Sequence, residues 1–205
     1  LYRPLNGELE AIREAAEREH VPIILRDTET LLLSLIRLKR PSRILEIGTA
    51  VGYSAACMAL ACENCRVVTI ESDSGMERRA RSNIRRLGLD ERIQVLQGKA
   101  QELLDGELFR NAPEPYDLVF IDAAKSHYRT FWEKTVPLCG AGAIILCDNV
   151  LMRGTTVSEE YDPKNKFRTS IRRMREFLAF LSETQIADTS ILPVGDGVSI
   201  SILKG

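Results

Sequence analysis

Two acidic residues and an asparagine directly follow two apolar segments of the chain. Asp122 comes after Leu118–Ile121, while Asp148 and Asn149 come after a stretch that ends at Cys147. Two carboxylates and an amide are hard oxygen donors, which suit a Mg²⁺-type ion that also takes substrate oxygens. Without a cation, two close carboxylates would resist ionising together. These three residues are therefore candidate metal ligands, although acidic residues in such places also cap helices.

Lys125 lies three residues after Asp122 and can project into the same region. A lysine beside a dication has a lowered pKa, because the like charge penalises its ammonium form. It could then take a proton from a substrate hydroxyl. Lys125 and Asp122 are thus candidate catalytic residues. Taken alone, Lys125 would be interpreted as an exposed lysine in a turn.

A glycine turn joins a strand-like run to a helix-like run at Glu46–Ser54, which reads Glu-Ile-Gly-Thr-Ala-Val-Gly-Tyr-Ser. Strand, glycine turn and helix form a nucleotide-binding crossover. The spacing of Gly48 and Gly52 matches neither a GxGxxG dinucleotide site nor a phosphate-binding loop. The pattern favours a ligand with an adenosine but no phosphates, such as S-adenosylmethionine (SAM). Gly48 would let the backbone approach it, and Gly52 would help the turn into the helix.

Glu71 ends the next strand-like run, roughly 20 residues after Gly48. An acidic side chain at that distance is placed to accept hydrogen bonds from ribose hydroxyls. A helix N-cap or a surface acid is the alternative. Because ligands of open α/β sheets bind beyond the carboxyl ends of the strands, we expect Glu71 and the candidate metal ligands to lie along one rim.

The remaining sequence alternates between strand-like and helix-like segments. Strands are predicted at Ile44–Ile47, Arg66–Ile70, Ile93–Leu96, Leu118–Ile121 and Ala143–Cys147. Helices are predicted at Glu8–Glu19, Thr28–Leu38, Tyr53–Ala61, Gly75–Leu87, Ala100–Phe109, Tyr128–Leu138 and Lys166–Leu181. This order predicts an α/β fold, with a mostly parallel sheet and helices on both faces. An Asp-Gly turn between Thr184–Leu192 and Gly197–Leu203 predicts a C-terminal antiparallel hairpin, and so seven strands in all.

Length and composition narrow the class of protein. With 205 residues, a single domain over 1–205 is expected, with N-terminal helices to residue 40 and the core from residue 41. The net charge of −1 gives no overall attraction to nucleic acid or membrane. No apolar run reaches the roughly 18 residues of a membrane span. Five cysteines, an odd count in mostly apolar surroundings, predict reduced and buried thiols in a cytoplasmic protein.

Four stretches together resemble the small class I, metal-dependent O-methyltransferases, which include catechol and caffeoyl-CoA O-methyltransferases. They are Leu45–Ser54, Phe120–Lys125, Cys147–Leu151 and Pro193–Val198. They occur in the right order over most of the chain. Within that group, the stretches His20–Ile23 and Asp148–Gly154 are most similar to bacterial tRNA 5-hydroxyuridine methyltransferases. The resemblance implies a Rossmann-like class I methyltransferase fold.

The resemblance also implies a role for individual residues. The SAM site would be formed by Leu25, Glu46, Gly48, Tyr53, Ser54, Glu71, Gly98, Ala100 and Asp122. Asp122, Asp148 and Asn149 would bind Mg²⁺, and Lys125 would be the general base. The chain departs from the family at Lys99, where an acidic residue is usual, so the adenine contacts must come from a backbone amide or Gln101. Ala123 and Ala124 replace bulky residues of the catechol enzyme, which suits a larger substrate.

The expected function is therefore SAM- and Mg²⁺-dependent O-methylation, with 5-hydroxyuridine of a tRNA anticodon loop as the favoured acceptor. Its hydroxyl lies beside a carbonyl, a chelating pair like that of a catechol. Basic residues that could contact tRNA are Arg78, Arg79, Arg85, Arg86, Arg153, Lys164, Lys166, Arg168, Arg172, Arg173 and Arg175. Alternatives are a small-molecule catechol or phenylpropanoid methyltransferase and a non-catalytic SAM-binding module. Relatives of this kind imply a homodimer.

Overall fold

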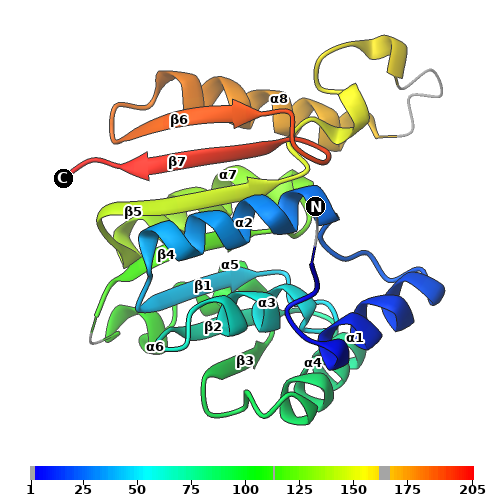
Figure 1. Cartoon of the computed structure of the whole chain (residues 1–205). Coiled ribbons are helices and arrows are strands. Elements are labelled where there is room, and N and C mark those ends of the chain that lie inside the picture. The colour runs from blue at the N-terminus through cyan, green and yellow to red at the C-terminus, as the bar shows by residue number, and fades with distance from the viewer. Residues whose placement is uncertain (1–2, 113, 162–166) are drawn as a thin grey trace.

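The computed structural model describes residues 3–112, 114–161 and 167–205, and within these residues the chain forms one seven-stranded sheet (Figure 1). The strands lie in the order β3-β2-β1-β4-β5-β7-β6. β7 runs antiparallel to both of its neighbours, which confirms the predicted mostly parallel sheet with an antiparallel C-terminal hairpin. The strands are β1 (Arg43–Ile47), β2 (Arg66–Glu71), β3 (Ile93–Gln97), β4 (Tyr116–Ile121), β5 (Cys139–Asp148), β6 (Ala187–Leu192) and β7 (Val198–Leu203).

Helices cover both faces of this sheet, as predicted (Figure 1). One apolar core lies under α1 (Gly7–Arg18), α2 (Arg26–Lys39), α3 (Tyr53–Ala61) and α4 (Ser74–Arg86). A second core lies under α5 (Ala100–Leu103), α6 (Glu107–Arg110), α7 (Tyr128–Thr135) and α8 (Arg168–Glu183). Successive strand side chains alternate between faces, so Ile44 packs into the first core while Leu45 and Ile47 pack into the second.

Two predicted helices end earlier than expected. The segment Ala100–Phe109 was predicted as one helix, but α5 and α6 are separated at Gly106, whose extended backbone precedes α6. The helix predicted to reach Leu138 ends at Thr135 and continues as the 3-10 turn Val136–Leu138. Pro137 lies in that turn and lacks the N–H that an α-helix would need there.

The turn between β6 and β7 lies against the loop that follows β5. Val150 N donates to the carbonyl of Gly197 over 2.9 Å, and Leu151 N donates to the carbonyl of Asp196 over 3.0 Å. Because β7 pairs with β5, the hairpin brings its turn to the end of the sheet where Asp148 is found. The antiparallel hairpin thereby helps to shape the loop that carries Asn149.

The described cysteines are all unpaired. Cys57, Cys65 and Cys147 are buried, as predicted, whereas Cys62 and Cys139 are partly exposed. Burial raises the pKa of Cys147 to about 12 and keeps its thiol protonated. Among the described residues no helix is both long and apolar enough to span a membrane.

Candidate functional site

A cleft of about 1230 Å³ opens at the carboxyl ends of the parallel strands. The chain order of the strands reverses between β1 and β4, where open α/β sheets place their ligand crevice. The residues that follow β1, β2, β3, β4 and β5 all border the cleft, together with the 21–25 segment before α2 and the β6–β7 turn. The structure therefore gathers the predicted strand-end residues at one rim.

Most of the predicted site residues line this cleft. Those that do are Leu25, Gly48, Tyr53, Ser54, Glu71, Gly98, Ala100, Asp122, Lys125 and Asn149. Glu46 and Asp148 are buried and are not part of the lining. Lys99 and Gln101 also border the cleft, beside Gly98 and Ala100.

Glu46 lies one residue before the end of β1 and faces the α1–α4 side. It pairs in register with Thr69 of β2, whose hydroxyl donates to Glu46 Oε2 over 2.5 Å. Glu46 Oε1 is buried without a hydrogen-bond partner among the described residues. Burial raises the pKa of Glu46 to about 7, with smaller contributions from the charges of Asp122 and Glu71.

The glycine turn after β1 is required by packing against β4. A Cβ on Gly48, which has a φ of +102°, would lie 1.9 Å from the carbonyl oxygen of Asp122. A glycine is therefore needed at this position because the chain at the end of β4 approaches closely, and not only because a ligand would. Gly52 has a φ of +82° and is the N-cap residue of α3, in agreement with its predicted role in the turn into this helix.

Glu71 joins the glycine turn to the turn after β2. Its carboxylate accepts hydrogen bonds from Ala50 N and Asp73 N, each over 2.8 Å. The alternative role as a helix cap belongs to Asp73, whose carboxylate accepts from Gly75 N and Met76 N at the start of α4. Glu71 therefore borders the cleft as an oriented acceptor.

Lys125 is held by oxygens from the loop after β4, the loop after β5 and the first residue of α7. Its Nζ donates to Asp122 Oδ1 over 3.0 Å, to Asn149 Oδ1 over 2.7 Å and to the Tyr128 hydroxyl over 2.6 Å. Tyr128 in turn donates to the carbonyl oxygen of Asp148 over 2.9 Å. Burial raises the pKa of Tyr128 well above its ordinary value, so this hydroxyl stays protonated.

Asp148 lies beside this cluster with one carboxylate oxygen unsatisfied. Oδ1 accepts from Asn149 N over 2.7 Å and from Thr28 over 3.4 Å. Oδ2 is buried and has no partner among the described residues. Burial and the charge of Asp122 raise the pKa of Asp148 to about 7.

These residues fit a divalent cation. The Lys125 ammonium, a positive charge, already lies between the oxygens of Asp122 and Asn149, and the orphaned oxygen of Asp148 lacks a partner that a cation would supply. The donors are hard oxygens, as Mg²⁺ prefers. Within the described residues there is no group of three or more His, Cys, Asp or Glu side chains that could hold a metal, and the candidate donor set instead combines two carboxylates with the amide of Asn149.

Three residues of the site were not predicted from the sequence: Tyr128 and Thr28 contact this cluster, and Asp196 borders the cleft. Tyr128 stands three residues after Lys125, a spacing that places both on one helical face and could have revealed it. Thr28 contacts Asp148 from α2, far away in the sequence. The β6–β7 turn supplies Asp196, which accepts a hydrogen bond from Arg153 N, and both residues border the cleft.

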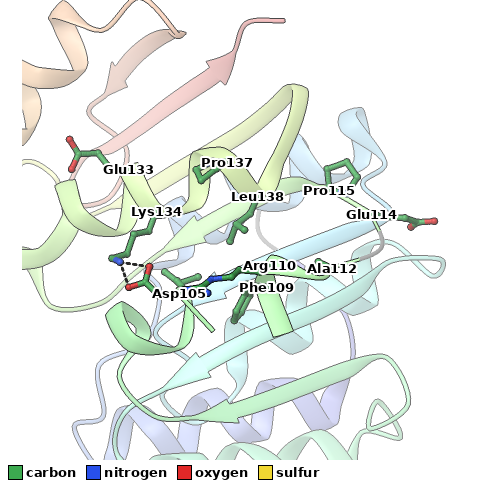
Figure 2. A pocket seen from close by; sticks show the side chains of 11 residues that line it. Asp105, Phe109, Arg110, Ala112, Glu114, Pro115, Glu133, Lys134, Pro137 and Leu138 are labelled. Carbon is green, nitrogen blue, oxygen red and sulfur yellow. Dashed lines mark hydrogen bonds and ion pairs between the residues drawn. The ribbon is translucent and has the colours of Figure 1, made fainter. Parts of the chain in front are cut away.

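A second cavity, of about 600 Å³, lies at the opposite end of the sheet (Figure 2). It is bordered by Pro115, just before β4, and by Leu138, just before β5. Asp105 and Lys134, which both line it, form an ion pair. None of the oxygens that surround Lys125 belongs to a residue lining this cavity, whereas Asp122 and Asn149 line the strand-end cleft. The chemically equipped site is therefore the strand-end cleft.

Comparisons with known proteins agree with this geometry. A family profile described as O-methyltransferase matches residues 6–204. A catechol O-methyltransferase of Niastella koreensis is 34% identical over 83% of this chain and 77% of its own. A caffeoyl-CoA O-methyltransferase of Populus kitakamiensis is 31% identical over 97% of this chain and 87% of its own.

Solved structures show the same fold with donor or product bound. An O-methyltransferase from Bacillus cereus in complex with SAH is 26% identical, with a TM-score of 0.87 over 100% of this chain and 94% of that one. TomG from Streptomyces achromogenes in complex with SAM is 27% identical, with a TM-score of 0.87 over 100% and 92%. The chain therefore belongs to the O-methyltransferase family, as a SAM-dependent enzyme of the catechol and caffeoyl-CoA type.

Proposed function

We propose that the strand-end cleft binds SAM, with Glu71 at the ribose and Tyr53 and Ser54 at the methionine end. Gly98 and Ala100 would border the adenine, and Leu25 would contact the donor through its backbone. Glu71 supports this assignment, because its carboxylate is oriented at the rim by Ala50 N and Asp73 N. The buried Glu46 would act from beneath the glycine turn rather than from the lining. SAM supplies an activated methyl group, so the protein mainly has to position the acceptor oxygen.

Asp122, Asp148 and Asn149 would hold Mg²⁺ in this proposal. When bound, the ion would lower the pKa of an acceptor hydroxyl and orient it. The observation that carries the proposal is the convergence of the Asp122 and Asn149 oxygens on one positive charge beside the donor cleft. Asp148 supports it further through its orphaned Oδ2.

Lys125 would accept the proton of the acceptor hydroxyl. Tyr128 holds its Nζ from the side opposite the cleft lining, since the Tyr128 side chain is fully buried while Lys125 borders the cleft. The hydroxyl of Tyr128 is itself fixed on the backbone of Asp148. This arrangement aims the amine at the position between Asp122 and Asn149.

The favoured acceptor is 5-hydroxyuridine in the anticodon loop of tRNA. A single-stranded base can be splayed into a pocket, and its phosphates require basic side chains nearby. The cleft is large, Ala123 and Ala124 add little bulk to its lining, and the exposed Arg153 borders it. These features suit an acceptor that extends beyond the cleft.

The wider basic surface is partly neutralised within the chain. Arg172 and Arg173 both lie near Glu176, and Arg175 donates to the carbonyls of residues 155 and 156. On α4, Arg79 and Arg86 form ion pairs with acidic residues of the first helix and its end. Lys164 and Lys166 lie outside the described residues. Arg153 is therefore the best supported contact for RNA.

A small catechol-like or phenylpropanoid acceptor is the second candidate. It is favoured by the relatives, which include enzymes named for catechol and caffeoyl-CoA. Such flat substrates bind well to aromatic walls. Phe131 and Tyr53 border the cleft and could form part of one.

One assay separates the two acceptors. The protein is incubated with methyl-labelled SAM and Mg²⁺, with either tRNA lacking the 5-methoxyuridine modification or a panel of catechols and caffeoyl-CoA. We expect label in tRNA at 5-hydroxyuridine, lost on addition of EDTA. Label in the small molecules alone would establish the second candidate, and EDTA-resistant transfer would contradict the metal role.

We also propose that the chain works as a homodimer through α2 and β7. Leu38 on α2 is 82% exposed, and Ile202 on β7 is 49% exposed. Both lie near the beginning of β5, because Lys39 bonds to the carbonyl of Gly142 and Ile202 pairs with Ile144. Light scattering should give twice the chain mass, and Leu38→Glu should halve it.

A further inference from the structure

A buried ion pair lies behind the wall of the cleft, where α1, α2 and α3 meet. Arg13 of α1 is 3% exposed, and Glu29 of α2 is 0% exposed. Arg13 Nη1 donates to Glu29 Oε2 over 3.0 Å, and the Tyr53 hydroxyl donates to the same oxygen over 2.9 Å. Tyr53 borders the cleft, whereas Arg13 and Glu29 do not.

Arg13 also contacts a second part of the same wall. Its Nη2 donates to the carbonyl of Ile24 over 3.0 Å, and its guanidinium carbon lies 5.1 Å from the centroid of the Tyr53 ring. Ile24 belongs to the 21–25 segment, which is neither helix nor strand and borders the cleft along its length. One buried arginine therefore fixes this segment and the Tyr53 ring relative to each other.

Stability alone does not account for the pair. Burying two charges costs free energy that their attraction often fails to recover, and apolar residues of similar volume are frequently as stable. Glu29 Oε1 is also buried without a hydrogen-bond partner among the described residues, which adds to the cost. The helices already bury apolar side chains such as Leu9, Ile12 and Leu32 in the same core. The network thus calls for a role at the wall that it supports.

We propose that Arg13 and Glu29 are positioning residues, which hold Tyr53 and the 21–25 segment as a preformed wall for SAM. This inference rests on the proposed function, in which Tyr53 lines the methionine end of the donor. A wall that is ordered before binding reduces the entropy lost when the ligand binds. Loss of the network should weaken SAM binding while proton transfer at Lys125 keeps its rate.

The test is the double variant Arg13→Met/Glu29→Gln, which removes both charges together and leaves neither one buried alone. We expect the Kd of SAH from calorimetry and the KM for SAM to rise about fivefold to tenfold, as for the loss of one hydrogen bond. At saturating SAM, kcat should stay within about twofold of the wild-type value. Arg13→Lys keeps a positive charge beside Glu29 but cannot bond to both Glu29 and Ile24. It should therefore also raise the Kd of SAH, and it replaces the double variant in the test if that variant does not fold.

Arg92→Met is the matched control. Arg92 anchors the C-terminal end of α3, because its Nη1 donates to the carbonyls of Ala59, Cys62 and Glu63. It should lower the Tm and leave the Kd of SAH unchanged. A folded double variant that binds SAH like the wild type would overturn the inference, as would an equal weakening by Arg92→Met. If the wild-type protein itself does not bind SAH, the proposed function fails as well.

Discussion

Three oxygens surround the Lys125 ammonium, and each belongs to a residue with a second constraint. Asp122 is fixed at the end of β4, where its carbonyl packs against Gly48. Asn149 adopts a φ of +57°, an uncommon conformation for a residue other than glycine, in the loop held by the β6–β7 turn. Tyr128 is buried and anchored on the backbone of Asp148. At the scale of single residues, the site is organised before any ligand binds.

Replacing Lys125 tests its role as the base. Lys125→Met keeps most of the side-chain volume but removes the proton acceptor, so kcat should fall by about a hundredfold or more. The Kd of SAH should stay near the wild-type value, because Asp122 is the one proposed donor contact among the described residues to which Lys125 Nζ bonds, and the other two bonds go to Asn149 and Tyr128. Single-turnover methylation and calorimetry measure the two quantities, and a fully active variant would remove Lys125 from the mechanism.

Glu46 predicts a pH dependence of stability in the protein without metal or SAM. Its folded pKa of about 7 exceeds the ordinary 4.5, so between these values the folded state holds a proton that the unfolded state has released. The unfolding free energy should therefore be highest below pH 4.5 and fall as the pH rises through 7. The loss from this group should be roughly 3 kcal/mol.

Urea unfolding at pH 5 and pH 8 measures this effect. Glu46→Gln keeps a hydrogen-bonding partner for Thr69 and cannot ionise, so the fall in unfolding free energy should shrink by a similar amount. Asp148 is also buried with a raised pKa, so the unfolding free energy of the variant should still fall with pH through the ionisation of Asp148. An identical pH dependence in both proteins would contradict the buried, protonated Glu46.

At the scale of elements, the β6–β7 turn connects α2 with the loop after β5. A Cβ on Gly195 would lie 2.4 Å from Thr28 Oγ1, the hydroxyl that reaches Asp148. A Cβ on Gly197 would lie 2.3 Å from Leu151. The turn therefore presses on both sides of the proposed metal ligands, and its glycines are explained by that packing.

Gly195→Ala should disturb both stability and the metal requirement. Gly88→Ala is the control, because Gly88 has a similar φ of +69° and open space around it. The control should cost only the left-handed strain, about 1 kcal/mol. Gly195→Ala should cost about 1–3 kcal/mol more through the clash, and should raise the Mg²⁺ concentration for half-maximal activity. Equal unfolding free energies and equal metal requirements in the two variants would refute this role of the turn.

The strands, the glycine turn and the C-terminal hairpin could be predicted, because apolar runs and glycine spacing are local signals. The burial of Glu46 could not be predicted, because a shift of one residue along β1 decides whether a side chain lies at the rim of the sheet or on its buried face. The break at Gly106 was missed because the surrounding segment favours a helix. The pair of Arg13 and Glu29 depends on how α1 packs on α2, which no local pattern reports.

At the scale of the whole molecule, a different cavity lies at each end of the sheet. The carboxyl ends carry the cleft with Arg153 at its border, whereas the other end carries the cavity of Figure 2, where Asp105 pairs with Lys134. Because the proposed donor site and Lys125 lie at the cleft, a large acceptor would approach over the loops that follow the strands.

Charge reversal at the two ends tests this approach. Arg153→Glu should weaken tRNA binding and reduce the slope of log K against log salt by about one or more. Arg110→Glu makes the same charge change at the distant cavity and should alter neither quantity. Filter binding at several salt concentrations gives both numbers. If the two variants behave alike, tRNA does not bind through the cleft mouth.

The most direct test of the whole account is a crystal structure with SAH and Mn²⁺, using the anomalous signal of manganese. We predict one manganese peak within coordination distance of Asp122, Asp148 and Asn149, with SAH beside it and its ribose hydroxyls on Glu71. A manganese peak elsewhere, or SAH bound away from these oxygens, would contradict the shared site for donor and cation.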